Sequence, residues 1–204
     1  TPALVASALA AAAGGPVAVG SVGAGTGATV GKAHGPAQGM KGGFGFASLT
    51  APGGVTVAAA VAVNAFGDVR DLAGRAVAGC RTTPDGLELA GAERVLAALS
   101  PEAAHPWEGN TTLAVVMTDA ALGKAAALKV SQMAFGGLYR TLAPALSLYD
   151  GDLVVTLASA ARPAALNQVG VLAERAVAEA ILVAVREADG FGILPAARDL
   201  PRSA

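Results

Sequence analysis

The sequence predicts a layered α/β fold in which two stacked sheets are sandwiched between helices. Strand-like apolar runs at residues 42–50, 55–66 and 153–159 are bounded by turn residues, as is typical of a sheet. Two long segments, 119–142 and 164–188, have helical character. Helices that each carry an apolar face need a sheet to cover, so the alternation of strands and long helices indicates layers.

Length and composition restrict the kind of protein. The 204 residues suffice for a core that needs no disulfide or metal, so we expect a single domain over 1–204. A net charge of −1, with 14% charged residues and no charge runs, indicates neither a nucleic-acid-binding face nor a membrane-binding patch. Cys80 has no disulfide partner, and His34 and His105 lack zinc-ligand spacing. We therefore expect an intracellular, metal-free protein.

The first segment, residues 1–13, is predicted to be a helix. Thr1 suits the N-cap and Pro2 the first helical position, and the alanines that follow favour helix. The first 31 residues carry no charge, but alanine and glycine dominate them and Gly-Gly-Pro at 14–16 interrupts the run. We therefore predict neither a transmembrane helix nor a signal peptide. Residues 17–22 then have the pattern of a strand.

The glycine-rich segment GAGTGATVGK at residues 23–32 only partly matches a phosphate-binding loop. The P-loop requires glycine and a hydroxyl residue at the positions that Thr26 and Ala33 occupy. The glycine spacing of dinucleotide-binding folds is not met either. The alternative is a glycine turn at which two backbones approach closely.

A hairpin is predicted for 42–50 and 55–66, joined at the Pro-Gly-Gly turn 52–54. The second strand is apolar on both faces, which is typical of a central strand. It leads into Asn64. An amide at the end of a buried strand is either a structural hydrogen-bonding group or the donor of an oxyanion hole.

Residues 68–106 are irregular, with one short helix near 92–99, and are predicted to form a surface excursion. The excursion leads to Asn110 and Thr111, where the next apolar run begins.

A long helix is expected from about 119 to 142, with Thr118 or Asp119 as its cap. A Gly-Gly pair at 136–137 inside it indicates either close packing against the sheet or a break. The last helix, 164–188, is amphipathic and predicted to cover a sheet. Its apolar face comprises Leu166, Val169, Ala173, Val177, Ala180 and Ala184.

The triplet Asp150-Gly151-Asp152 places two carboxylates at the beginning of the strand 153–159. Such a triplet is usually a turn. It could also contribute acidic side chains to a site.

The sequence Gly-Asn-Thr-Thr at 109–112 places a hydroxyl residue after a Gly-Asn pair at the start of a strand. Attack of the Thr111 hydroxyl on the Asn110 carbonyl would convert the peptide bond to an ester, and hydrolysis would leave Thr111 as a new N-terminus. Its α-amine, with an unperturbed pKa of roughly 7.7–8.0, could then serve as general base for the hydroxyl. The alternative is a turn followed by a β-branched strand start.

Six segments, in this order, resemble the self-processing DmpA-type aminopeptidases, a family that includes β-peptidyl aminopeptidases. They are GAGTG at 23–27, KGGFG at 41–45, VAVN at 61–64, GNTT at 109–112, VVMTDA at 115–120 and DGD at 150–152. The resemblance covers nearly all of the chain. It implies an αββα sandwich, a fold shared with the ornithine acetyltransferases. It also implies that the chain cleaves itself into two at the peptide bond before the nucleophile.

Residue by residue, the resemblance implies that Thr111 is the nucleophile and Asn64 the oxyanion donor. Asp150 and Asp152 fall in the segment that orients and tunes the nucleophile, with aspartate in place of the family's first hydroxyl residue. Cleavage between Asn110 and Thr111 would leave 1–110 as the C-terminal part of the first subunit and 111–204 as the second.

The activity implied is hydrolysis of a small amide or peptide through an acyl-enzyme on Thr111. The implied protein is cytoplasmic and cofactor-free, has no nucleic-acid or membrane partner, and is a homo-oligomer of processed subunit pairs. The chain starts at Thr1, where family members are already well into their first subunit, so we expect that it lacks the family's N-terminal segment. One alternative is an acyltransferase similar to the ornithine acetyltransferases, which differs only in the fate of the acyl-enzyme. Another is a non-catalytic binding or assembly module.

Overall fold

The computed structural model describes residues 1–100 and 109–201. Residues 101–108, which hold His105 and the end of the predicted excursion, lie outside the described residues, as do 202–204. The α-helices of the described part are α1 (Pro2–Ala10), α2 (Ala92–Ala97), α3 (Lys124–Thr141) and α4 (Leu166–Arg186). Its strands are β1 (Thr29–Val30), β2 (Met40–Lys41), β3 (Gly43–Thr50), β4 (Thr56–Asn64), β5 (Asp68–Arg70), β6 (Ala76–Ala78), β7 (Thr111–Ala120), β8 (Leu142–Ala143) and β9 (Leu153–Arg162).

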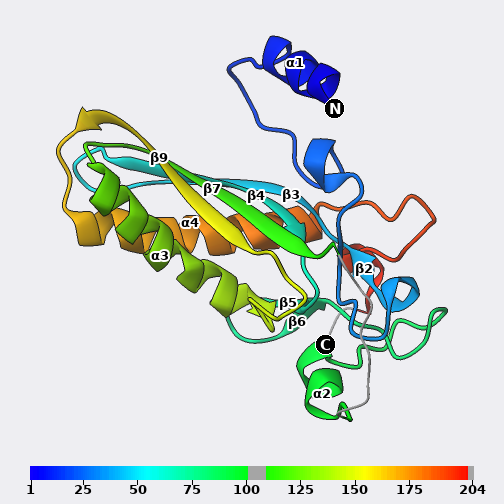
Figure 1. The fold of residues 1–204 in the computed structure, drawn as a ribbon. Coiled ribbons are helices and arrows are strands. Elements are labelled where there is room, and N and C mark those ends of the chain that lie inside the picture. The colour runs from blue at the N-terminus through cyan, green and yellow to red at the C-terminus, as the bar shows by residue number, and fades with distance from the viewer. Residues whose placement is uncertain (101–108, 202–204) are drawn as a thin grey trace.

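A four-stranded sheet in the order β3-β4-β7-β9 forms the centre of the structure (Figure 1). The predicted hairpin is present: β3 and β4 are antiparallel, and Gly53 and Gly54 in the turn between them have φ of 101° and 88°. β4 is also antiparallel to β7, and β7 is parallel to β9. The parallel pair requires a crossover, and the connection from β7 to β9 includes α3.

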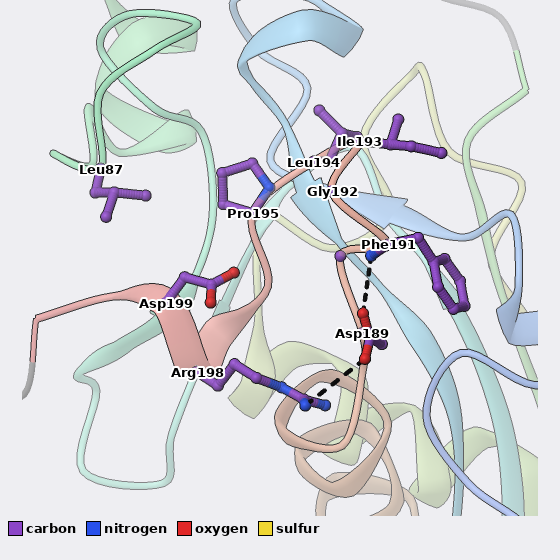
Figure 2. Close-up of a pocket in the computed structure, with 10 residues that line it drawn as sticks. Leu87, Asp189, Phe191, Gly192, Ile193, Leu194, Pro195, Arg198 and Asp199 are labelled. Atoms are coloured by element: carbon purple, nitrogen blue, oxygen red, sulfur yellow. Dashed lines mark hydrogen bonds and ion pairs between the residues drawn. The ribbon is translucent and has the colours of Figure 1, made fainter.

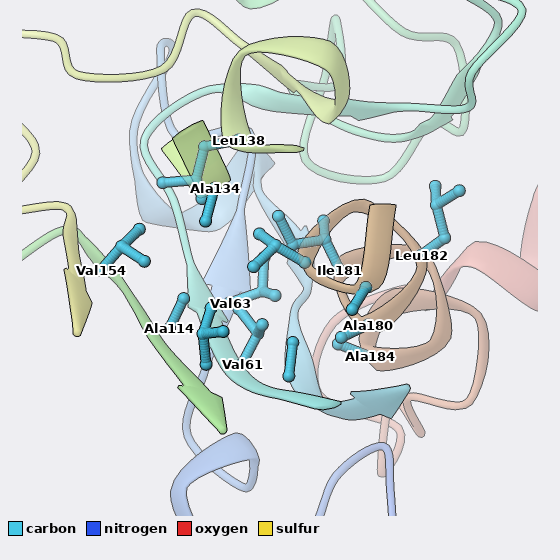
Figure 3. Close-up of a cluster of buried hydrophobic side chains, with 14 of the residues drawn as sticks. Val61, Val63, Ala114, Ala134, Leu138, Val154, Ala180, Ile181, Leu182 and Ala184 are labelled. Atoms are coloured by element: carbon cyan, nitrogen blue, oxygen red, sulfur yellow. The ribbon is translucent and has the colours of Figure 1, made fainter. Parts of the chain in front are cut away.

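Both long helices pack on one face of this sheet (Figure 1). The layer between them and the strands is built from small and medium apolar side chains, among them Val61, Val63 and Ile181 (Figure 3). The buried residues of α4 include five that its spacing predicts, namely Val169, Ala173, Val177, Ala180 and Ala184. The layered α/β class is therefore confirmed.

The glycine pair of α3 is a place of close helix packing. A Cβ on Gly137 would lie 2.6 Å from the main-chain oxygen of Glu174 in α4. The helix continues past both glycines to Thr141, so it does not break. The sequence predicted close packing, but the close neighbour is the second helix instead of the sheet.

The opposite face of the sheet is open in the described chain. Leu113 of β7 and three apolar residues of β9 (Leu153, Val155 and Leu157) are between 41% and 56% exposed. The remaining strands form two small sheets, β1-β2 and β6-β5-β8. Residues 1–100 and 109–201 thus supply one large sheet and one helical layer of the predicted sandwich, and no second large sheet is stacked on this face within them.

Two predictions for the N-terminal part need correction or limits. Residues 17–22 form no strand, and only Gly20 bridges Phe44. α1 forms as predicted but is wholly exposed, and the Thr1 side chain makes no capping hydrogen bond.

The glycine turn predicted within residues 23–32 is confirmed, because a Cβ on Gly25 would overlap the backbone of Phe44. None of the described helices is long and apolar enough to cross a membrane.

The start predicted for the long helix was wrong. Thr118 and Asp119 belong to β7, and α3 begins only at Lys124. Both side chains instead bind the start of β4. Thr118 Oγ1 donates to the Thr56 carbonyl at 2.8 Å, and Asp119 Oδ1 accepts from the Thr56 N–H at 2.8 Å. Polar residues suited to a helix cap serve here to fix strand register.

Candidate active site

Three strand ends bring the predicted site residues together. β4 ends at Asn64, and β7 begins at Thr111, which lies opposite Asn64 in the antiparallel register. β9 runs parallel to β7, so both strands begin at the same end of the sheet, where Asp150 bridges Asn110. Segments far apart in the sequence therefore meet around one peptide bond.

Thr111 borders a cavity of about 260 Å³ on the open face of the sheet. The cavity is lined by Ala24, Gly27, Ala28, Ala62, Asn64, Thr111 and Leu113. The Thr111 hydroxyl donates to the carbonyl oxygen of Asn110. The nucleophile expected from the sequence thus lies beside the peptide group that it is expected to attack.

The adjacent Thr112 has the opposite environment. Successive side chains of a strand point to opposite faces, so only one of the two threonines can border the cavity. Thr112 is fully buried, and its hydroxyl has no hydrogen-bond partner among the described residues. Of the two adjacent hydroxyls, Thr111 is the one available to a substrate.

The side chain of Asn64 has a fixed orientation. Its Oδ1 accepts from the Thr29 N–H and from Lys32 Nζ, each at 3.0 Å. Its Nδ2 donates to the Gly109 carbonyl at 2.8 Å, one residue before the Asn110–Thr111 bond. The Thr29 hydroxyl also donates to Oδ1, at 3.4 Å. With the oxygen held by these three donors, the NH₂ end of the amide faces the segment that precedes Thr111.

Gly151 adds a donor that the sequence analysis missed. Its backbone N–H donates to the Asn110 carbonyl oxygen at 3.0 Å. A Cβ at this position would lie 2.9 Å from Thr111 Oγ1, so glycine allows the two segments to approach. A backbone donor leaves no mark in the sequence apart from the glycine that makes room for it.

Asp152 binds the backbone next to Thr111. Its Oδ1 accepts from the Thr112 N–H at 2.7 Å, and its Oδ2 accepts from the Leu146 N–H at 3.0 Å. Both carboxylate oxygens are therefore engaged with main-chain donors on either side of the site. The side chain ties the start of β7 to the loop before β9.

Asp150 is partly buried and binds groups on two other segments. It accepts from the Phe66 N–H at 2.9 Å and from the Ser147 hydroxyl. Burial raises the pKa of the Asp150 carboxyl, an effect that these two hydrogen bonds and the charge of Lys32 partly offset. The carboxylate thus links the segment after β4 to the loop that carries Gly151.

Lys32 is a charged residue of the site that the sequence analysis considered only as a phosphate ligand. Its side chain is buried, and Nζ donates to Oδ1 and to the main-chain carbonyl of Asn64, at 3.0 and 3.1 Å. Burial lowers its pKa to about 8, and the negative charge of Asp150 counteracts part of that shift. The sequence feature that could have singled out Lys32 is that it is the first charged residue, after 31 uncharged ones.

A larger cavity, of about 440 Å³, lies in another part of the structure (Figure 2). It is formed by the loop 189–195 with Leu87, Arg198 and Asp199. Asp189 pairs with Arg198 at 3.8 Å and accepts from the Phe191 N–H, so these polar groups hold the loop itself. The cavity includes no predicted site residue. Within the described ranges, no group of three or more His, Cys, Asp or Glu side chains is arranged to hold a metal.

Comparison with solved structures gives the class of fold. The chain is similar to a β-aminopeptidase of Burkholderia sp., with a TM-score of 0.62 and 27% identity over 90% of this chain and 51% of that one. It is also similar to the L-aminopeptidase D-Ala-esterase/amidase of Ochrobactrum anthropi, which is described as a variant of the N-terminal-nucleophile hydrolase fold. That match has a TM-score of 0.60 and 22% identity, over 91% of this chain and 49% of the other.

Sequence comparison gives the family. Peptidase family S58 matches residues 1–193. An uncharacterized aminopeptidase of Mycobacterium leprae is 37% identical over 88% of this chain and 52% of its own length. One of Mycobacterium tuberculosis is 38% identical over 93% and 59%. The chain belongs to peptidase family S58, which confirms the resemblance to the DmpA-type aminopeptidases, and it spans between 52% and 59% of the length of these relatives.

Proposed function

We propose that the chain is the nucleophile-bearing part of a self-processing aminopeptidase or amide hydrolase, with Thr111 as nucleophile. One observation carries the proposal: the Thr111 hydroxyl lies against the Asn110 carbonyl at a cavity that Asn64 also lines. Membership of a peptidase family, and relatives described as aminopeptidases, support the reaction class.

The first reaction is cleavage of the chain. The Thr111 oxygen attacks the Asn110 carbonyl carbon, and the C–N bond breaks as the nitrogen takes up the hydroxyl proton, which leaves an ester and a free amine. Water then hydrolyses the ester to an Asn110 carboxyl terminus and a Thr111 amino terminus. Negative charge develops on the Asn110 oxygen during the attack, and the Gly151 N–H already donates to that oxygen at 3.0 Å.

The second reaction is hydrolysis of a small amide or peptide. The α-amine of Thr111 takes the hydroxyl proton and passes it to the leaving amine, giving an acyl-enzyme that water hydrolyses. Asn64 Nδ2 donates to the substrate oxyanion after cleavage releases the Gly109 carbonyl, to which it donates in the uncut chain. Asp150 and Asp152 hold the segments around Thr111 and supply negative charge near its ammonium group.

Cleavage leaves the two pieces paired. β7 belongs to the second piece, yet it is hydrogen-bonded along its length to β4 of the first. Helix α4, also in the second piece, packs on β3 and β4 of the first. This arrangement supports a processed pair of subunits as the basic unit, which we propose to assemble further as a homo-oligomer in the cytoplasm.

Two matched variants of the full-length protein test the proposal. Thr111→Val removes the hydroxyl at the cavity, so the protein should remain one chain and should not hydrolyse amide substrates. Thr112→Val removes the buried hydroxyl that has no partner, and this protein should still split between Asn110 and Thr111. Intact-mass spectrometry and an amidase assay distinguish these outcomes. Wild-type protein that stays uncut and inactive would overturn the proposal and favour the non-catalytic module.

A further inference from the structure

We infer that Lys32 is a positioning residue that fixes the direction of the Asn64 amide and so directs the oxyanion donor toward Thr111. The inference rests on the proposed function, in which Asn64 Nδ2 serves the reaction of Thr111. The family resemblance assigns a role to Asn64 but none to Lys32.

The contacts of Asn64 select one of two amide orientations. Lys32 Nζ lies 3.0 Å from Oδ1, and the Thr29 N–H lies at the same distance. A flipped amide would set its NH₂ group against these two donors and its oxygen against the Gly109 carbonyl. In the uncut chain, Lys32 and the Thr29 N–H oppose the flip at one end of the group, and the Gly109 carbonyl opposes it at the other. Once cleavage releases Gly109, Lys32 is the charged group that still opposes the flip.

The backbone of Lys32 is hydrogen-bonded to the segment that directly follows Asn64. Its backbone N–H donates to the Phe66 carbonyl at 2.8 Å, and the neighbouring Gly31 N–H donates to the Gly67 carbonyl at 2.8 Å. Lys32 Nζ also donates to the main-chain carbonyl of Asn64 at 3.1 Å. The cation thus binds two oxygens of one residue from a backbone that is anchored just beyond the end of β4.

The position of Lys32 Nζ beside Asn64 Oδ1 also favours a direct electrostatic effect on the N–H groups of the Asn64 amide. A cation at Oδ1 draws electron density from the amide, which makes its N–H groups stronger donors in a buried environment. Asp150 is the acidic group whose charge acts on Lys32 and supports its ammonium form. With a pKa of about 8, the lysine is mostly protonated at pH 7.

A double-mutant cycle in the full-length enzyme tests the inference, with Lys32→Met, Asn64→Ala and the double variant. Methionine keeps the length of the side chain but removes the cation. We expect Lys32→Met to lower kcat by roughly tenfold or more, the effect of losing a charged hydrogen bond, with little change in KM. In the Asn64→Ala background the same substitution should have no further effect, because its target is absent.

Lys41 provides the matched control. It is also buried, but its Nζ donates to the Thr26 carbonyl at 2.8 Å. Lys41→Met should therefore change kcat by the same factor with and without Asn64. Lys32→Gln, which keeps a neutral donor, should recover part of the activity lost in Lys32→Met and serves if the methionine variant folds poorly.

Two results would overturn the inference while leaving the proposed function intact: an unchanged kcat in folded Lys32→Met, or an equal loss in both Asn64 backgrounds. Wild-type enzyme that neither splits nor hydrolyses amides is a different failure, since it removes the reaction that Lys32 is inferred to serve.

Discussion

Thr111 lies between two regions that use charge in opposite ways. On the β4 side, the cation of Lys32 binds the oxygen of the Asn64 side-chain amide, whose NH₂ end donates to the Gly109 carbonyl, two residues before Thr111. On the β9 side, the carboxylates of Asp150 and Asp152 accept hydrogen bonds from backbone N–H groups. The first region orients a side-chain amide, and the second holds the main chain around the Asn110–Thr111 peptide bond. Substitutions on the two sides should therefore differ in kind as well as in size.

The largest effect should come from Asn64→Ala on the β4 side. Loss of a single oxyanion donor typically lowers turnover by roughly 10²–10³-fold, and we expect a loss in kcat of that size. Steady-state kinetics on the processed enzyme would measure it, with circular dichroism to show that the fold is retained. A loss of less than about threefold would mean that the amide does not face the substrate oxyanion and is only structural.

A pH-dependent effect on stability should identify the buried cation on the same side. Burial lowers the pKa of Lys32 from 10.5 to about 8, so between these values the unfolded chain binds more protons than the folded one. The stability of wild type relative to Lys32→Met should therefore rise with pH across that window, by as much as about 3 kcal/mol, and be constant below it. Urea unfolding of both proteins from pH 7 to 10 would test this. Parallel curves would show that Lys32 titrates normally.

On the β9 side, Asp152→Asn should act mainly on stability. The carboxylate accepts from the Thr112 and Leu146 N–H groups, whereas an amide has only one acceptor atom and would turn its NH₂ toward one of these donors. We expect a loss of about 1–3 kcal/mol in the free energy of unfolding. We also expect slower precursor cleavage, because the start of β7 is less well held. Stability equal to wild type would show that the two backbone contacts contribute little.

The sequence predicted the parts of this arrangement that depend on pattern. Strand and helix periodicity indicated the layered class and the buried face of α4, and motif order indicated the family and placed Asn64, Thr111 and Asp150–Asp152 in one site. Local propensity failed where tertiary contacts decide the outcome. Thr118 and Asp119 look like a helix cap, but they bind Thr56 in the neighbouring strand.

The supporting residues of the site could not be predicted, for a different reason. Lys32 acquires its role from burial against Asn64, and Gly151 acquires its role from a backbone N–H that a fold must aim. Neither property is encoded by spacing along the chain. Thr111 itself was predicted from the motif, and the structure adds that its neighbour Thr112 is buried whereas Thr111 borders the cavity.

The smallest effect should be that of Asp150→Asn, which tests the second carboxylate independently of Asp152. Asparagine can still accept from the Phe66 N–H and can donate to the Ser147 oxygen, so the change at pH 7 should be less than about 1 kcal/mol. Burial raises the pKa of Asp150, so the folded wild type binds more protons than the unfolded chain just above pH 3.8, and its stability falls as pH rises through that window. The asparagine variant lacks this titration and should gain stability relative to wild type over the same rise in pH.

Because the charge of Asp150 raises the pKa of Lys32, the Asp150→Asn variant should also show a lower Lys32 pKa than wild type. A Lys32 titration that is identical in the two proteins would show that the two sides of Thr111 are electrostatically independent.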